Sequence, residues 1–143
     1  MNTLRKSQIR RGFTLIEILV VVVILAVLAA VVVPNVINRI GDAKASAAIS
    51  DIKAFDTNID LFKLDTGKYP PTLDDLIKDV SQTSKWNGPY IKNKDKIQND
   101  PWGSAYVYKV PGENGHDYEI VSYGPNSQPG GGDDIESWNL EGS

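Results

Sequence analysis

The chain has 143 residues, a formal net charge of −3 and no cysteine. This length suffices for one domain and one membrane segment, but not for two large domains. The lack of cysteine excludes disulfides, cysteine–zinc sites and a thiol nucleophile. The acidic balance beyond the first twelve residues argues against a nucleic-acid partner and fits cation binding or simple solubility.

The stretch from Phe13 to Val33 is apolar except for Thr14 and Glu17. A helix of about 20 apolar residues crosses a bilayer core, so this stretch predicts a single transmembrane helix. The charged residues that precede it are all basic, namely Arg5, Lys6, Arg10 and Arg11. By the positive-inside rule, we expect a cytoplasmic N-terminus and an exported remainder.

Glu17 is the one acid inside this apolar stretch. A carboxylate costs roughly 2.5–3.5 kcal/mol at the centre of a membrane helix and less near its end, so Glu17 requires a partner. A secretory signal peptide is an alternative interpretation, but its apolar core is usually about 7–15 residues long. The stretch ends at Val33-Pro34 without an Ala-x-Ala cleavage pattern. An uncleaved signal anchor remains open.

The residues around the start of the apolar stretch are Arg11-Gly12-Phe13-Thr14-Leu15-Ile16-Glu17. This segment closely resembles the type IV prepilin signal. The resemblance implies that prepilin peptidase cuts between Gly12 and Phe13 and that the new N-terminus of Phe13 is methylated. It also implies that Glu17 meets the Phe13 amine of a neighbouring subunit during assembly, where such a pair would fix register. The expected divisions are a leader, 1–12, and a transmembrane or filament-core helix, 13–33.

After Pro34, which should bend or loosen the helix, an amphipathic pattern continues to about Leu64. Its apolar positions follow steps of three and four residues and form one stripe: Ala45, Ala48, Ile52, Phe55, Ile59 and Phe62. This spacing predicts that the helix continues and packs its stripe against the exported head, 34–143.

The rest of the head is expected to be small and mixed. Gly67 suits a helix C-cap, and Thr72 with Asp75 forms a capping box for a short helix from Leu73 to Val80. The segments 105–110 and 117–122 alternate and predict an antiparallel hairpin. The fold class is therefore α+β, with a helical spine on a sheet of two or three strands.

The tail after Gly124 has the composition of a loop, but Ile135 and Trp138 give it apolar side chains to bury. Asp133 and Asp134 are adjacent in it. Calcium takes six to eight oxygen ligands from such loops. The EF-hand spacing is missing, so the residues alone leave a solvated acidic loop and a calcium site both open. His116 is expected in an exposed loop, and no catalytic constellation is present, so we predict no enzyme activity.

The head resembles the major pseudopilins of type II secretion, the general secretion pathway protein G family within the type IV pilin-like superfamily. The residues that carry the resemblance are Thr66-Gly67-Lys68-Tyr69-Pro70, Gly88-Pro89-Tyr90-Ile91-Lys92, Asp100-Pro101-Trp102-Gly103 with Tyr106 and Tyr108, Pro111-Gly112-Glu113-Asn114-Gly115, and Ser122-Tyr123-Gly124 through Asp133-Asp134-Ile135 to Trp138. The resemblance implies a C-terminal calcium-binding loop with the Tyr123 backbone carbonyl, Asn126, Asp133 and Asp134 as ligands. Asn126 replaces the acid usual in that family, and fewer charged ligands imply weaker binding.

The same resemblance implies a structural subunit that polymerises into a periplasmic pseudopilus. Its expected partners are further copies of itself, prepilin peptidase, minor pseudopilins and the inner-membrane assembly platform. The expected location is the inner membrane, with one pass, a cytoplasmic N-terminus and a periplasmic head. A major or minor subunit of a surface type IV pilus is the alternative, although such pilins commonly carry a C-terminal cysteine pair that is absent here. A signal-anchored periplasmic binding module is a third.

Overall fold

The structure is a computed structural model that describes residues 12–140. Its contacts divide the chain into two compact units, 1–40 and 41–143. The predicted leader lies outside the described residues, apart from Gly12. Among the described residues, no helix is both long enough and apolar enough to span a membrane.

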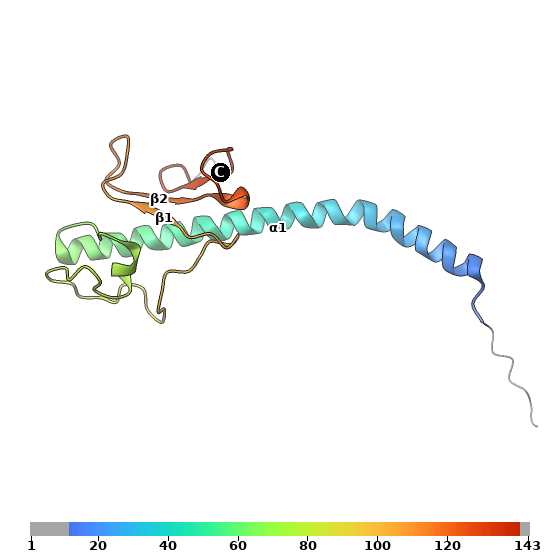
Figure 1. The fold of residues 1–143 in the computed structure, drawn as a ribbon, viewed down its shortest axis with the longest axis horizontal. Helices are drawn as coiled ribbons and strands as arrows, with labels where there is room; N and C mark the ends of the chain where they lie inside the picture. The colour runs from blue at the N-terminus through green and yellow to red at the C-terminus, as the bar shows by residue number, and fades with distance from the viewer. Residues whose placement is uncertain (1–11, 141–143) are drawn as a thin grey trace, which may run out of the picture. The chain divides into compact units, whose positions relative to one another are not determined.

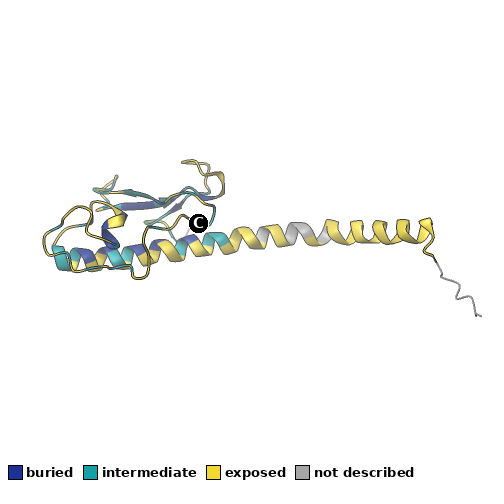
Figure 2. Ribbon diagram, turned by 60° about the horizontal axis from the view of Figure 1, so that its bottom comes forward, coloured by how far each residue is buried: buried dark blue, intermediate teal, exposed yellow. Residues whose placement is uncertain are grey.

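One helix, α1 (Leu15–Thr66), runs through both units and confirms the predicted single long helix. It ends at Gly67, whose positive φ of 79° and N–H bond to the Lys63 carbonyl (2.8 Å) match the predicted C-cap. The backbone is helical through position 34, so Pro34 does not end the helix. The described side chains of α1 in the first unit are all exposed (Figure 2).

In the second unit, α1 carries the buried stripe that the sequence predicts. Ile52, Ile59 and Phe62 have no exposed surface. The core combines the stripe of α1 with residues from the short 3₁₀ helix and from the sheet side of the head. From α1 it takes Ala48, Ile52, Phe55, Ile59 and Phe62, and from the rest of the head it takes Leu73, Leu76, Tyr106, Ile120 and Ile135. The rest of the head therefore packs against the single apolar stripe of the helix.

The sheet has three antiparallel strands, β1 (Val107–Lys109), β2 (Glu119–Ser122) and β3 (Ile135–Glu136), in the order β1-β2-β3 (Figure 1). Tyr108 lies opposite Ile120 and Ser122 lies opposite Ile135. The predicted hairpin is confirmed with shorter strands. The third strand comes from the tail, whose composition had suggested a loop.

Tyrosine hydroxyls tie the sheet side of the head to the polar flanks of α1. Tyr106 donates to Asp51 (2.9 Å) and Tyr118 donates to Asp56 (3.0 Å). Each tyrosine also contributes its ring to the apolar layer, since Tyr106 packs edge-on against Phe55 with 5.2 Å between centroids. These side chains therefore join the core to the solvated flanks of the helix.

The short helix after α1 is the 3₁₀ helix η1 (Leu73–Leu76), so the predicted helix to Val80 is too long. The reason is Asp75, which is fully buried. Its carboxylate accepts the Thr72 N–H (3.1 Å) as predicted for a capping box, but it also accepts the Ser81 N–H (2.8 Å) and hydroxyl (2.9 Å). These bonds turn the chain back instead of letting the helix continue.

Two predictions for the tail had different outcomes. Ile135 is 3% exposed and belongs to the core, as expected. Trp138 is 41% exposed, so its expected burial is wrong. It stacks on His116 with ring centroids 5.2 Å apart, and that contact leaves His116 half-buried rather than fully exposed.

Candidate functional site

The C-terminal loop begins at the 3₁₀ helix η2 (Gly124–Asn126), directly after Tyr123, and returns to the sheet at Asp133 and Asp134. The two ends of the loop touch at Gly124, where φ is +61°. A Cβ built there would lie 2.2 Å from the Asp133 carbonyl oxygen, which is closer than any side chain allows. Glycine is thus required for this backbone approach.

Asn126 and Asp133, two of the four predicted ligands, are in direct contact. The Asn126 side-chain amide donates to Asp133 Oδ1 (2.5 Å) and to the Gly130 carbonyl (3.3 Å). The Asn126 backbone N–H donates to Asp133 Oδ2 (3.2 Å). The side-chain oxygen of Asn126, Oδ1, accepts the Gln128 N–H (2.6 Å). The asparagine therefore holds one acid and caps the turn at the same time.

Asp134 differs from Asp133 because only one of its oxygens has a partner. Its Oδ2 accepts the Gly130 N–H (2.7 Å), whereas its Oδ1 is buried without a hydrogen bond. A buried carboxylate oxygen with no donor is unfavourable and needs an explanation, such as a bound ion or water. The oxygen set of this loop, two carboxylates and an amide, is chemically suited to a hard cation.

The donor set has a limit. Within residues 12–140, no three His, Cys, Asp or Glu side chains are grouped so that they could hold a metal ion. The loop brings together two acids, and the remaining predicted ligands are the neutral Asn126 amide and the Tyr123 backbone carbonyl. The oxygen ligands that these residues offer are suited to calcium, but only two of them are charged.

The base of the loop is anchored by a residue that the sequence analysis did not assign a role. Asp100 is 4% exposed and accepts the Ser122 hydroxyl (2.6 Å) on one oxygen. Its other oxygen accepts the N–H groups of Trp102 (3.1 Å) and Ser104 (2.8 Å). The Asp-Pro-x-Gly signal marks such a turn, and the buried bond to β2 explains why an acid is needed there.

Gly12 and Phe13 precede α1, and Phe13 is 78% exposed. Thr14 and Glu17 form the start of the helix, with the Glu17 N–H donating to Thr14 Oγ1 (3.3 Å) and the Thr14 N–H donating to the Glu17 carboxylate (3.5 Å). This is the Ser/Thr-x-x-Glu capping box, which the sequence analysis recognised at Thr72 but missed here. Glu17 is exposed and has a role within its own helix.

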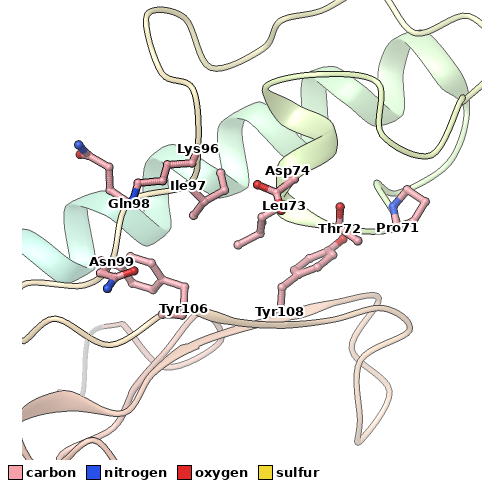
Figure 3. A pocket seen from close by; sticks show the side chains of 11 residues that line it. Pro71, Thr72, Leu73, Asp74, Lys96, Ile97, Gln98, Asn99, Tyr106 and Tyr108 are labelled. Atoms are coloured by element: carbon pink, nitrogen blue, oxygen red, sulfur yellow. The ribbon is translucent and has the colours of Figure 1, made fainter.

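A groove of about 470 Å³ lies between η1, residues 96–99 and β1 (Figure 3). Its charged side chains are Asp74 and Lys96. The hydroxyls of its two tyrosines are occupied, since Tyr106 bonds Asp51 and Tyr108 donates to the Pro70 carbonyl (2.9 Å). The hydroxyl of Thr72, which also lines the groove, donates to the buried Asp75 carboxylate (2.7 Å) that shapes the chain after η1.

Comparisons with known proteins place the chain in a family. Residues 35–138 match the family model "Type II secretion system (T2SS), protein G", and residues 8–33 match the "Prokaryotic N-terminal methylation motif". The chain is 44% identical to the type II secretion system core protein G of Pseudomonas aeruginosa, over 89% of this chain and 94% of that protein. It is 40% identical to the protein of that name from Escherichia coli K12, over 96% and 97%.

A solved structure is similar as well. The crystal structure of the major pseudopilin from the type 2 secretion system of enterohaemorrhagic E. coli aligns with a TM-score of 0.57 and 31% identity, over 75% of this chain and 96% of that chain. The family match, the identity over nearly the full length of the relatives and the shared fold agree with one another. The chain belongs to the type II secretion system protein G family.

Proposed function

We propose that this chain is a major pseudopilin, a structural subunit rather than an enzyme, that polymerises into the periplasmic pseudopilus of a type II secretion system. The observation that carries the proposal is the match of residues 35–138 to the protein G family. The resemblance to the family includes the turn at Asp100, which anchors the C-terminal loop through its bond from Ser122.

Assembly would begin with processing of the N-terminus. Prepilin peptidase would remove residues 1–12, and the Phe13 amine would be methylated, as the match to the N-terminal methylation motif supports. Residues 13–33 would hold the subunit in the inner membrane, with the head in the periplasm, until it joins the filament. The apolar sequence of that stretch supports this step. Minor pseudopilins and the inner-membrane platform are the other partners.

Processing is tested by changing Gly12 in cells that express prepilin peptidase. Gly12→Val should leave all of the chain as precursor, seen by intact mass, because the peptidase would require glycine before the cut. Gly41→Ala is the matched control, since Gly41 is exposed within α1 with open space around it. Normal cleavage of the Gly12 variant would contradict the proposal.

The assembly role of Glu17 must be separated from its role as a helix cap. Glu17→Gln retains a capping-box side chain but removes the charge, whereas Thr14→Ala removes the cap and retains the charge. If Glu17 pairs with the Phe13 amine of a neighbour, Glu17→Gln is processed but assembles poorly, and Thr14→Ala assembles well. Cross-linked multimers on a gel report the difference. The reverse result would make Glu17 a structural cap alone.

We further propose that the C-terminal loop binds Ca²⁺ through Asp133, Asp134, Asn126 and the Tyr123 backbone carbonyl. The buried, unpartnered Oδ1 of Asp134 supports this proposal, because a cation would satisfy it. Bound calcium would add positive charge that holds the two acids together. Binding is expected to be weak for a site of this kind, since only two of its four proposed ligands are charged.

Thermal melting of the full-length chain in detergent tests the calcium site. The melting temperature should be several degrees higher in excess Ca²⁺ than in excess EDTA, because a ligand that binds only the folded state stabilises it. Asp133→Ala should remove the difference. Superimposable curves for the unchanged protein would contradict the calcium proposal without affecting the family assignment.

A further inference from the structure

We propose that the side-chain amide of Asn126 takes the place of a cation beside Asp133 and so keeps the C-terminal loop closed without one. Calcium must then displace that amide in order to bind. The first half of this proposal depends only on the contacts of Asn126. The second half rests on the calcium site proposed above.

The contacts of Asn126 join three points of the loop. Its amide nitrogen bonds both Asp133 Oδ1 and the Gly130 carbonyl, and its backbone N–H bonds the other oxygen of Asp133. Asp133 therefore has a donor on each oxygen, both supplied by one residue. A bond from an amide to a carboxylate is a charge-assisted hydrogen bond and is stronger than a neutral one.

The direction of the Asn126 amide is set by its neighbours. Its carbonyl oxygen accepts the Gln128 N–H at 2.6 Å, while its nitrogen faces the Asp133 oxygen at 2.5 Å. Turning the group over would place oxygen against carboxylate oxygen and NH₂ against N–H, so both contacts would become repulsive. Calcium ligation needs the carbonyl oxygen of Asn126 to face the ion, and it is already engaged with Gln128.

An aspartate at position 126 would behave in the opposite way. Its side chain could not donate to Asp133, and two carboxylates at this distance repel one another. The loop would then depend on a cation to bring positions 126 and 133 together. The neutral amide thus lowers the affinity of the loop for calcium and keeps the loop closed in its absence.

The experiment compares melting temperatures of the full-length chain in detergent, with EDTA and with Ca²⁺ as the probe. In EDTA, Asn126→Ala should melt about 4–8 °C below the unchanged chain. It removes the side-chain hydrogen bonds of Asn126 to Asp133, Gly130 and Gln128, which are exposed and together are expected to contribute about as much as one typical net hydrogen bond. Asn126→Asp should melt lower still in EDTA, and calcium should restore it with about tenfold tighter binding than in the unchanged chain. Asn87→Asp, which adds the same charge at another exposed position, should change neither value.

A different experimental result would contradict each part of the proposal. If Asn126→Ala melts in EDTA at the temperature of the unchanged chain, Asn126 does not hold the loop. If the unchanged chain and Asn126→Asp bind calcium equally, the amide does not compete with the ion. If neither responds to calcium, the calcium site fails, while the result in EDTA still decides the role of Asn126.

Hydrogen exchange on the unchanged chain provides a test without a variant. In EDTA, the backbone N–H groups of Asn126, Gln128 and Gly130 should exchange slowly, because each donates within the loop. Saturating calcium should speed exchange at Gln128 alone, since its acceptor would turn toward the ion. Fast exchange at all three in EDTA would overturn the closed loop.

Discussion

The two parts of α1 have similar apolar side chains but opposite surroundings. In residues 15–40, the large apolar side chains reported as exposed range from 48% at Val36 to 86% at Leu15. In residues 41–66, Ile52, Ile59 and Phe62 are completely buried by the head. The apolar stripe of the second part therefore has its partners within the chain, whereas the described side chains of the first part are all exposed.

This difference shows what the first part of α1 must obtain from outside. Removing a large apolar side chain from water contributes about 1.5–3 kcal/mol, so a full helix of exposed ones strongly favours another apolar environment. Lipid before assembly and neighbouring copies after it would both supply one. The second part has only one apolar stripe, and the head already covers it.

The largest effect is expected from a truncation in the buried stripe. Phe62→Ala should lower the free energy of unfolding of the head by about 3–5 kcal/mol, because it removes a fully buried ring and leaves a cavity. Leu64→Ala, two residues along and 81% exposed, should change it by about 0.5 kcal/mol or less. Denaturant unfolding followed by tyrosine and tryptophan fluorescence gives both values. Equal losses would remove the distinction between the faces of α1.

A smaller effect is expected at Asp75, and it depends on pH. Burial acts to raise the pKa of Asp75, but the hydrogen bonds from Thr72 and Ser81 outweigh it and hold the pKa below its ordinary value. A lowered folded-state pKa adds stability above the unfolded-state pKa of about 3.9, and this stability is lost as pH falls through the folded-state value.

Asp75→Asn should therefore cost about 1.5–3 kcal/mol at neutral pH, the range for hydrogen bonds to a charged group. The difference from the unchanged chain should shrink in acid. Unfolding measured from pH 7 to pH 2 tests this expectation. A difference that stays constant with pH would mean that the charge of Asp75 is not what matters.

The next effect concerns the ties between the sheet and the flank of α1. Tyr106→Phe should lower the free energy of unfolding by about 0.5–1.5 kcal/mol, because it removes the bond to Asp51 and keeps the ring in the core. Burial, followed by the hydrogen bond to Asp51, raises the pKa of Tyr106 well above its ordinary value, so this loss should be constant from pH 5 to about 9. A double-mutant cycle with Asp51→Ala should account for the loss as pairwise coupling.

The smallest effect on the head is expected from the first part of α1. Leu25→Ala, at a side chain that is 59% exposed, should leave the unfolding of the head within about 0.5 kcal/mol. It should nevertheless reduce the yield of cross-linked multimers, since neighbouring copies would lose contact area. A destabilised head would show that the two parts of α1 are less independent than their burial indicates.

Much of this fold could be predicted because it depends on periodicity. The buried stripe of α1 follows three- and four-residue spacing, and the hairpin follows alternation, so both are visible in the sequence. β3 could not be predicted, because two residues inside a glycine-rich tail carry no period. Trp138 was misjudged because a tryptophan in a polar tail can stack on the surface, as it does on His116.

The residues of the candidate site were named by resemblance, and the contacts among them could not be predicted. The resemblance named Asn126, Asp133 and Asp134, and the structure places these three in one loop. Nothing in the spacing shows that the Asn126 amide faces Asp133 or that one Asp134 oxygen lacks a partner. Those contacts depend on the close approach of the two ends of the loop at Gly124 and Asp133, which is a property of the tertiary structure.

The close approach at Gly124 determines which positions of the loop can accept a different amino acid during evolution. Gly130 and Gly132 also have positive φ, but a Cβ at either would meet nothing within 4 Å, so asparagine could replace them with modest strain. At Gly124 any side chain would push against the Asp133 backbone and move both acids. Sequence drift in related pseudopilins is thus expected at 130 and 132, while position 124 admits a single amino acid.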